Sequence, residues 1–349
     1  MLKVIITFDY EIFFGKNNAS ENEILFSPTE DLLTLLNKYN LKGTFFADVL
    51  SVEAYKRENP QNKYSVLFEN QLRDMTKAGH DVQLHIHPHW ITAKYDKAIK
   101  QWIIDPKTYR IHYFLDNNDL EINAETIIQN GISYLSETIK PVNEQYKVYA
   151  YRAGGYCIQP EEELFKLLSK NGIEIDSSVC VGKKLHSEAH FFDFDKEYDE
   201  LNWKLASDIV ELPIGSVNNN LLKRFIPGTG FQTLEKKPAK GEGIAGTTKA
   251  TQSKFKRLLH FNKTKREFGL EFMHYKQLMY GLKQYYKKYD CKNQDKYVAV
   301  ICHPKSMDSI SIKNMEIFIN KVLENKKWVC FSTLKEMRNC INNQEASSV

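Results

Sequence analysis

Residues 2–8 read Leu-Lys-Val-Ile-Ile-Thr-Phe, a short apolar run that is rich in β-branched side chains. Residues 29–39 follow it with apolar side chains at helical spacing. The run predicts a buried strand, and the change of period predicts a helix packed beside it. The same change recurs further along the chain, at 43–47 with 69–78 and at 82–86 with 124–138. Repeated strand–helix units of this kind are typical of an α/β protein with a parallel sheet or barrel.

The alternation continues to the end of the chain. Further strands are expected at 148–151, 173–175, 209–213, 297–302 and 329–331, and further helices at 161–170, 268–288, 312–324 and 334–340. About eight strands favour closure into a barrel, or an open doubly wound sheet of similar size. The length of 349 residues allows one domain or two.

Two segments interrupt the rhythm. Residues 89–123 are rich in Trp, Tyr and Asp without a clear period, and are either a structured excursion or a lid over a site. Residues 227–266 combine glycines with an excess of basic side chains, which predicts a flexible insertion that could contact an anionic ligand or lipid head groups. We therefore expect a single barrel domain over 1–340 that carries both segments, and a tail over 341–349.

The composition narrows the class of protein. Lys plus Arg is 48 and Asp plus Glu is 44, and 48 − 44 gives a net charge of +4, so a nucleic-acid partner is not expected. The chain contains no apolar stretch of about 18 residues that would predict a membrane-spanning helix, and no secretion signal is visible, so we expect a cytoplasmic protein. The six cysteines form no CxxC pair, which argues against a disulfide frame or a thiolate zinc site.

Two acids end the first predicted strand. Asp9 and Glu11 are two residues apart, so the pleat of a strand turns both side chains to one face. Burying paired carboxylates is costly unless a cation or a shared proton holds them, which indicates a site. The alternative is a polar strand end that faces solvent.

Three histidines end another predicted strand, at positions 85, 87 and 89. If the chain stays extended, His85, His87 and His89 share one face. If it turns helical at Pro88, His85 and His89 are the pair that can bind one ion. Either geometry predicts a metal site.

Further polar residues follow other strands. Arg152 lies in the stretch 151–156 with two glycines, Asp176 follows 173–175, and His303 follows 297–302. Taken singly, each has a structural alternative: a turn with a surface Arg, a helix cap, or a packed His. Together they place polar side chains at five strand ends, where sites assemble in parallel α/β folds.

At these residues the sequence resembles the polysaccharide deacetylase superfamily, the carbohydrate esterases with the NodB homology domain. The five motifs of that superfamily are matched in order by 7–11, 85–89, 152–156, Asp176 and His303. The resemblance implies a distorted (β/α) barrel of about seven strands. It also implies one divalent metal ion, expected to be Zn²⁺ with Co²⁺ or Ni²⁺ as alternatives, and hydrolysis of the N-acetyl group of a sugar.

The resemblance also implies a role for each residue. Asp9 would be the general base, and Glu11, His85 and His89 would be the metal ligands. Arg152 would orient Asp9, Asp176 would tune His303, and His303 would protonate the leaving amine. A backbone N–H of Gly155 or Tyr156 would hold the oxyanion. The remaining predicted contacts with the substrate are those of His87 and Trp90.

Three features depart from the family pattern. Tyr10 separates the two acids, and Gly154 and Gly155 replace the usual proline and aromatic residue, which leaves the oxyanion donor open. His87 is an additional histidine that could replace either neighbour as ligand or point at the substrate. Trp90, with Trp102, Tyr109 and Tyr113, could form a sugar-stacking wall or simply pack the excursion onto the barrel.

The expected function is therefore removal of an N-acetyl group from a sugar. The missing export signal and the basic insertion favour a nucleotide sugar, or a lipid-linked glycan for a surface polysaccharide that the protein would contact peripherally. One alternative is a metal-dependent hydrolase of a non-sugar amide, such as a ureide, an imide or an acylated polyamine. The other is a glycan-binding homologue that has lost catalysis.

Overall fold

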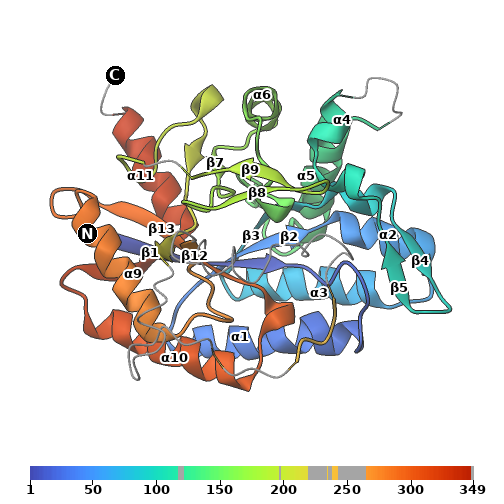
Figure 1. The fold of residues 1–349 in the computed structure, drawn as a ribbon, viewed down its shortest axis with the longest axis horizontal. Coiled ribbons are helices and arrows are strands. Elements are labelled where there is room, and N and C mark those ends of the chain that lie inside the picture. The colour runs from blue at the N-terminus through green and yellow to red at the C-terminus, as the bar shows by residue number, and fades with distance from the viewer. Residues whose placement is uncertain (117–121, 196–197, 219–233, 235–237, 243–264, 347–349) are drawn as a thin grey trace, which may run out of the picture.

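The structure, a computed structural model, describes residues 1–116, 122–195, 198–218, 234, 238–242 and 265–346 (Figure 1). Its centre is a parallel sheet of eight strands. They are β1 (Leu2–Tyr10), β2 (Thr44–Asp48), β3 (Asp81–Ile86), β6 (Ala150–Ala153), β7 (Ile175–Asp176), β10 (Val210–Glu211), β13 (Lys296–Cys302) and β14 (Val329–Ser332). Seven of them run in the order β10-β7-β6-β3-β2-β1-β13, and β14 pairs with the first half of β1.

The two ends of this seven-strand path meet. Just after β10, Ile214 forms a parallel bridge to Ala299 of β13. The Gly215 N–H donates to the Ala299 carbonyl at 3.1 Å, and the Ala299 N–H donates to the Pro213 carbonyl at 2.9 Å. Because β7 and β10 are only two residues long, the ring is uneven. The distorted (β/α) barrel of about seven strands that the sequence predicts is confirmed.

The pleat of β1 separates an inner from an outer core. Val4, Ile6 and Phe8 face the outer core between strands and helices, and Ile5 belongs to the inner core of the barrel. All four side chains are buried, as expected for a strand of a parallel sheet that is covered on both faces. Continuing the period of two from Ile5 brings Asp9 to the inner face of the barrel at its carboxyl end.

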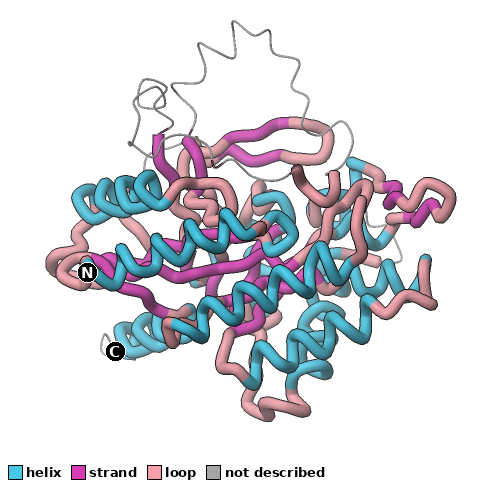
Figure 2. The backbone as a smooth tube through the Cα atoms, turned by 90° about the horizontal axis from the view of Figure 1, so that it is seen from below, coloured by secondary structure: helices cyan, strands magenta, loops and turns pink. Residues whose placement is uncertain are grey.

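Helices cover the outside of the barrel (Figures 1 and 2). In Figure 1, α1, α3 and α10 lie below β1, β2 and β3, and α6 lies well above these strands. The helices are α1 (Ser27–Lys38), α2 (Leu50–Glu58), α3 (Tyr64–Lys77), α5 (Ala124–Ile139), α6 (Glu162–Lys170), α9 (Tyr275–Lys288), α10 (Ser309–Glu324) and α11 (Leu334–Ala346), and a π-helical turn η1 (Asn22–Phe26) leads into α1. The predicted tail begins too early, because residues 341–346 continue α11. None of the described helices is long and apolar enough to cross a membrane.

The segment 89–123 is a structured excursion over its described part. It contains the short helices η2 (Pro88–Ile91), η3 (Pro106–Tyr109) and α4 (His112–Asp116), and the hairpin of β4 (Lys94–Asp96) and β5 (Gln101–Ile103), at the right of Figure 1. Trp90 and Trp102 are buried and pack edge to face at 4.9 Å. Trp102 also packs edge to face on Tyr55 of α2 at 5.0 Å, so these aromatic side chains hold the excursion against a helix of the barrel.

Most of the predicted insertion 227–266 lies outside the described residues. Its described residues 240–242 pair with the loop that follows β1: the Gly15 N–H donates to the Glu242 carbonyl at 3.0 Å, and the Asn18 N–H donates to the Lys240 carbonyl at 2.8 Å. On its other side this loop meets β5, since the Trp102 N–H donates to the Gly15 carbonyl at 3.3 Å. The loop after Glu11 is thus held between two segments that are distant in sequence.

Short elements complete the described chain. Two antiparallel pairs are formed by β8 (Lys184–His186) with β9 (Phe191–Asp193) and by β11 (Ser216–Asn218) with β12 (Lys265–Glu267). Single helical turns are η4 (Gly154–Tyr156), η5 (Ala206–Asp208) and η6 (Pro304–Ser306). Two of these turns, η4 and η6, directly follow barrel strands, so their residues lie beside the strand ends that carry the candidate site.

Candidate metal centre and hydrolytic site

Six of the predicted site residues meet at the carboxyl end of the barrel. They come from or directly after four strands: Asp9 and Glu11 from β1, His85 and His87 from β3, Arg152 from β6 and His303 from β13. All except His303 are buried, and the His303 side chain is 22% exposed. The strand-end pattern in the sequence therefore corresponds to one cluster in space.

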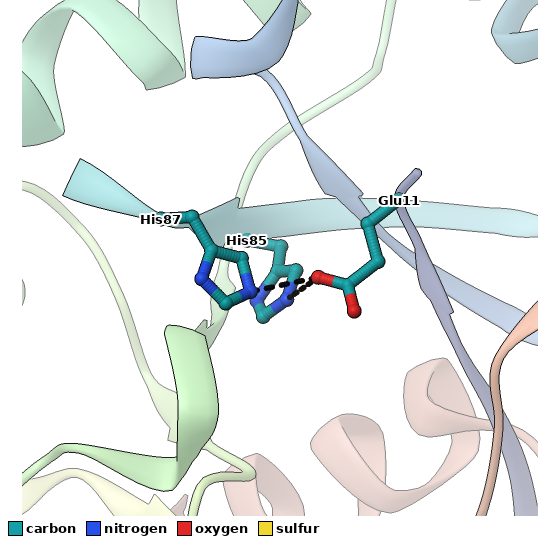
Figure 3. Close-up of side chains that lie close together, drawn as sticks. All are labelled: Glu11, His85 and His87. Carbon is teal, nitrogen blue, oxygen red and sulfur yellow. Dashed lines mark hydrogen bonds and ion pairs between the residues drawn. The ribbon is translucent and has the colours of Figure 1, made fainter. Parts of the chain in front are cut away.

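Glu11, His85 and His87 form the centre of this cluster (Figure 3). The Nε2 atoms of His85 and His87 lie 3.1 Å and 2.7 Å from the same carboxylate oxygen, Oε2 of Glu11. Among the described residues these three form the group whose potential ligand atoms all lie within 4.8 Å of one another. Two imidazoles and one carboxylate are the protein ligands of one common type of catalytic zinc site.

The tautomer of His85 calls for either a proton or a metal ion between its Nε2 and Glu11. Its Nδ1 lies 2.8 Å from the backbone oxygen of Arg152, an acceptor only, so Nδ1 carries the hydrogen. In the neutral ring, Nε2 then points a lone pair at the Glu11 carboxylate. This contact is favourable only with a proton or a metal ion between the two acceptors, and a hydrogen bond from the other ring nitrogen is the usual second-sphere support of a metal-bound histidine.

The backbone explains why His87, and not His89, joins Glu11. His87 is extended, with φ −108° and ψ 93°, and the turn η2 begins only at Pro88. His85 and His87 therefore share a strand face, and the turn carries the next histidine away. The ring of His89 is buried and stacked on Tyr109 at 5.1 Å, and neither of its nitrogens has a protein partner. Of the two histidines that the sequence left open, the structure therefore brings His87, and not His89, to Glu11 and His85.

Burial and neighbouring charges set the pKa values of this group. Burial lowers the pKa of His87 to about 4 despite the nearby Glu11 carboxylate. Burial also opposes ionisation of Glu11, but the Lys305 ammonium and His87 outweigh it and hold the pKa of Glu11 well below its usual range. At neutral pH the group thus contains an ionised carboxylate and a neutral His87, which are the protonation states that metal ligands require. Burial would also lower the pKa of His85, but its hydrogen bond to Glu11 and the nearby carboxylates raise it, so a metal ion would compete with a proton at His85.

Gly154 makes room for His87. A Cβ on Gly154 would lie 2.5 Å from Nδ1 of His87 and 2.7 Å from the carbonyl oxygen of Ile86. Both distances are shorter than any real Cβ contact, and a backbone carbonyl cannot move aside cheaply. Glycine at 154, where the family pattern has a proline, therefore permits the position of the additional histidine.

Asp9 is held by a buried arginine. The Arg152 guanidinium donates to Oδ1 of Asp9 at 2.5 Å, to the Thr7 hydroxyl at 3.1 Å, and to the hydroxyl and carbonyl of Ser177 at 2.7 and 2.8 Å. It lies over the ring of Phe46 at 4.2 Å. Burial alone would raise the pKa of Asp9, but the Arg152 charge helps to hold it below its usual value. Asp9 is thus an ionised carboxylate with a fixed orientation.

His303 is paired with Glu271, a residue that the sequence analysis did not single out. Nδ1 of His303 lies 2.7 Å from Oε1 of the buried Glu271, and its Nε2 lies 3.6 Å from Oδ2 of Asp9. Burial would lower the pKa of His303, but its hydrogen bond to Glu271 and the nearby carboxylates raise it. A protonated His303 directed at Asp9 is suited to give up a proton in the site.

Asp176 has other partners than the expected His303. Its oxygens accept hydrogen bonds from the hydroxyl of Ser178 at 2.7 Å and from the Ser178 N–H at 3.0 Å. On the neighbouring strand, Glu211 is its register partner, and burial with the adjacent Asp176 charge holds the pKa of Glu211 well above its usual range. The expectation that Asp176 tunes His303 is therefore wrong. Asp176 instead supports the turn that follows β7.

Trp90 is also placed differently from the expectation. Its side chain is fully buried, and its indole N–H donates to Oδ2 of Asp48 at 2.6 Å, so it is a packing residue and not a substrate contact. Asp48, at the end of β2, is a second buried carboxyl that the sequence analysis missed, and burial raises its pKa to about 7. Gly155 and Tyr156 lie in η4 with left-handed φ values of 59° and 62°, directly after Arg152 and Ala153. Their predicted part in holding an oxyanion stays a prediction.

The described residues line at least two cavities. The larger, about 930 Å³, lies between α1, the start of α10 and residues 238–240, and reaches the site at Lys305. The smaller, about 320 Å³, lies near Glu174 and Arg338 at the opposite end of β7. Of these two cavities, the larger borders the cluster and the smaller lies away from it.

Comparison with known families agrees with the motifs at the amino-terminal strands. Residues 3–110 match the family model described as polysaccharide deacetylase. The predicted resemblance is confirmed there. The match to the deacetylase model contains Asp9, Glu11, His85 and His87, whereas Arg152 and His303 lie beyond it. No curated protein matches the chain.

Solved structures of deacetylases and related proteins resemble this chain at low sequence identity. A Mycobacterium smegmatis protein assigned to the polysaccharide deacetylases is 13% identical, with a TM-score of 0.48, over 99% of this chain and 91% of that chain. Puue allantoinase is 11% identical, with a TM-score of 0.47, over 96% and 88%. A peptidoglycan N-acetylglucosamine deacetylase domain from Eubacterium rectale is 12% identical, with a TM-score of 0.37, over 95% and 88%. Similarity at this level transfers no activity to the chain.

Proposed function

We propose that this protein is a metal-dependent hydrolase that removes the N-acetyl group of a sugar during the synthesis of a surface polysaccharide or a glycan precursor. The observation that carries the proposal is the convergence of His85 and His87 on one oxygen of Glu11, beside an Asp9 carboxylate that Arg152 holds in place. The match of residues 3–110 to the deacetylase family supports the reaction class.

The residues that would hold the metal are Glu11, His85 and His87. A divalent cation bound by two imidazoles and a carboxylate supplies a Lewis acid for the amide carbonyl and lowers the pKa of a water molecule that it binds. The ligand types suit Zn²⁺, Co²⁺ and Ni²⁺, among which Zn²⁺ is our first choice.

Asp9 is the proposed general base. Its carboxylate is ionised, and Oδ1 is engaged by Arg152, which leaves Oδ2 for a proton from the attacking water. Arg152 acts through Asp9 as a positioning residue, because its guanidinium is fully buried and bonded on several sides.

His303 is the proposed general acid. Glu271 accepts from Nδ1–H and so directs Nε2 toward the side of Asp9 on which the leaving amine would form. The raised pKa of His303 keeps the ring protonated until the amine leaves. Glu271 is then the positioning residue for His303, the role that was expected of Asp176.

The test is hydrolysis of a panel of amides by protein loaded with Zn²⁺, Co²⁺ or Ni²⁺ and by chelated protein, followed by acetate release for the acetylated substrates and by loss of the substrate for the ureide. The panel contains an N-acetylated nucleotide sugar, N-acetylglucosamine oligomers, a ureide and an acetylated polyamine. We expect activity on a sugar substrate with metal only. Asp9→Asn should lower kcat about 10²- to 10⁴-fold and leave metal content unchanged. Asp74→Asn, at an exposed carboxylate of α3, is the matched control.

Each alternative function has its own outcome in this test. Activity confined to the ureide or the polyamine would show that the substrate is a non-sugar amide and not a sugar. Binding of glycan without acetate release from any substrate would favour a non-catalytic homologue. Full activity of Asp9→Asn would refute the mechanism.

The role of Glu271 is tested separately by Glu271→Gln. The amide still accepts from Nδ1–H but carries no charge, so the pKa of His303 should fall and the alkaline limb of the kcat profile should move to lower pH. An unchanged profile would show that Glu271 does not act through His303.

A further inference from the structure

The two oxygens of the Glu11 carboxylate have different partners. Oε2 faces the two histidines, whereas Oε1 accepts a hydrogen bond from the Lys305 ammonium at 2.7 Å. Lys305 was not among the residues that the sequence pattern indicated, and it lies two positions beyond His303, in η6. One carboxylate is thus shared between a lysine and the proposed ligand group.

Lys305 is fixed in this position by several contacts. Its ammonium also donates to the Ile12 carbonyl at 2.9 Å and lies over the rings of Phe14 and Phe13 at 4.3 and 5.3 Å. Its side chain is only 10% exposed. A lysine held by two hydrogen bonds and two aromatic faces has little freedom to leave Glu11.

We infer that Lys305 is a positioning residue that occupies Oε1 of Glu11, so that Glu11 binds the divalent metal through Oε2 alone. This inference rests on the proposed metal site. A carboxylate can bind a metal ion through one oxygen or through both, and a hydrogen bond to one oxygen favours the first mode. One-oxygen binding leaves a coordination position open for water or substrate, as catalytic zinc sites require.

A purely electrostatic role of Lys305 makes a different prediction. A positive charge close to the ligand group would simply weaken binding of any cation. Its removal would then tighten metal binding and leave the coordination number unchanged. The two roles can therefore be separated by a measurement of coordination.

The experiment is X-ray absorption spectroscopy of the Co²⁺-loaded full chain, combined with titration of Co²⁺ affinity. Lys305→Met removes the ammonium and keeps most of the side-chain volume. Lys313→Met is the control, since Lys313 borders the same cavity from the exposed side of α10. We expect one-oxygen Glu11 ligation in the wild type and in Lys313→Met. In Lys305→Met we expect an additional oxygen ligand, the second oxygen of Glu11, whatever the change in Co²⁺ affinity.

Several outcomes would overturn the inference. An unchanged coordination number in Lys305→Met, with tighter or equal binding, would leave Lys305 as a charge only. Two-oxygen ligation in the wild type would refute the inference even if the variant fails to fold. In both of these results the wild type still binds Co²⁺. If the proposed function itself is wrong, the wild-type chain should bind no Co²⁺ at all.

Discussion

The pair of Asp9 and Arg152 provides a sharp prediction about stability. Both side chains are almost fully buried, and the guanidinium donates to Asp9, Thr7 and Ser177. In Arg152→Met the apolar chain fills much of the space but deprives the Asp9 carboxylate of its main counter-charge, while His85 and His303 remain near Oδ2. Removing one partner of a buried ion pair costs about 3–5 kcal/mol, because the remaining charge stays out of water. We expect a loss of this size in the free energy of unfolding at pH 7.

The assay is urea unfolding of the metal-free protein, followed by circular dichroism. With a slope of about 3 kcal/mol per M urea, the midpoint of Arg152→Met should fall by about 1–2 M. The double variant Asp9→Asn/Arg152→Met removes both charges and should be more stable than Arg152→Met by about 2 kcal/mol or more, because replacing both partners costs much less than removing one.

Two results would refute this reasoning. A loss of less than about 1 kcal/mol in Arg152→Met would mean that the Asp9 carboxylate is not desolvated as its burial indicates. Losses that simply add in the double variant would mean that the two charges do not interact.

Two further predictions concern His80 and Gly154. Nδ1 of buried His80 accepts a hydrogen bond from the Gly43 N–H, and burial lowers the pKa of His80 from 6.5 to about 4. The folded state therefore binds fewer protons at His80 than the unfolded state. The contribution of neutral His80 to the free energy of unfolding is fully present above pH 6.5 and is lost as the pH falls through 4. The difference of about 2.5 in pKa corresponds to about 3 kcal/mol of stability. The free energy of unfolding of the wild type should exceed that of His80→Asn by about 3 kcal/mol less at pH 4 than at pH 7. A difference that does not change with pH would contradict this prediction. Gly154→Ala should displace His87 and weaken Co²⁺ binding about 10- to 100-fold, measured by titration. Gly172→Ala is the control: its left-handed φ of 83° strains the alanine, but the Cβ meets open space, so Co²⁺ affinity should not change. Equal affinity in both variants would count against the His87 ligand.

Much of the fold could be predicted because its signal is periodic. The alternation of apolar runs and helical patterns indicated parallel strands, and the carboxyl ends of such strands meet at one edge. This rule alone brought Asp9, Glu11, His85, Arg152 and His303 together. It depends on the backbone and not on side-chain detail, which is why a single sequence was enough for it.

The errors arose where a local conformation decided the contact. The pattern at 85–89 allowed an extended or a helical chain, and only the start of η2 at Pro88 selected His87 over His89. Asp176 was assigned to His303 from the family pattern, but strand register places Glu211 beside it. These choices depend on one turn and one register, neither of which has a periodic signal in the sequence.

The missed residues were of a different kind. Asp48 directly follows a predicted strand and could have been found by the same strand-end rule. Glu271 and Lys305 lie in irregular segments, and charged residues there are usually exposed to solvent. Their burial depends on tertiary contacts with His303 and Glu11, which local sequence does not reveal.

The most direct test of the central claim is the metal content of the protein, purified without a metal-binding tag and measured by elemental analysis in the wild type, His87→Ala and His89→Ala. With Glu11, His85 and His87 as ligands, the wild type and His89→Ala should each carry about one equivalent of a divalent transition metal, and His87→Ala should lose it. Metal retained in His87→Ala but lost in His89→Ala, or no metal in the wild type even after incubation with Zn²⁺, Co²⁺ or Ni²⁺, would contradict this metal site.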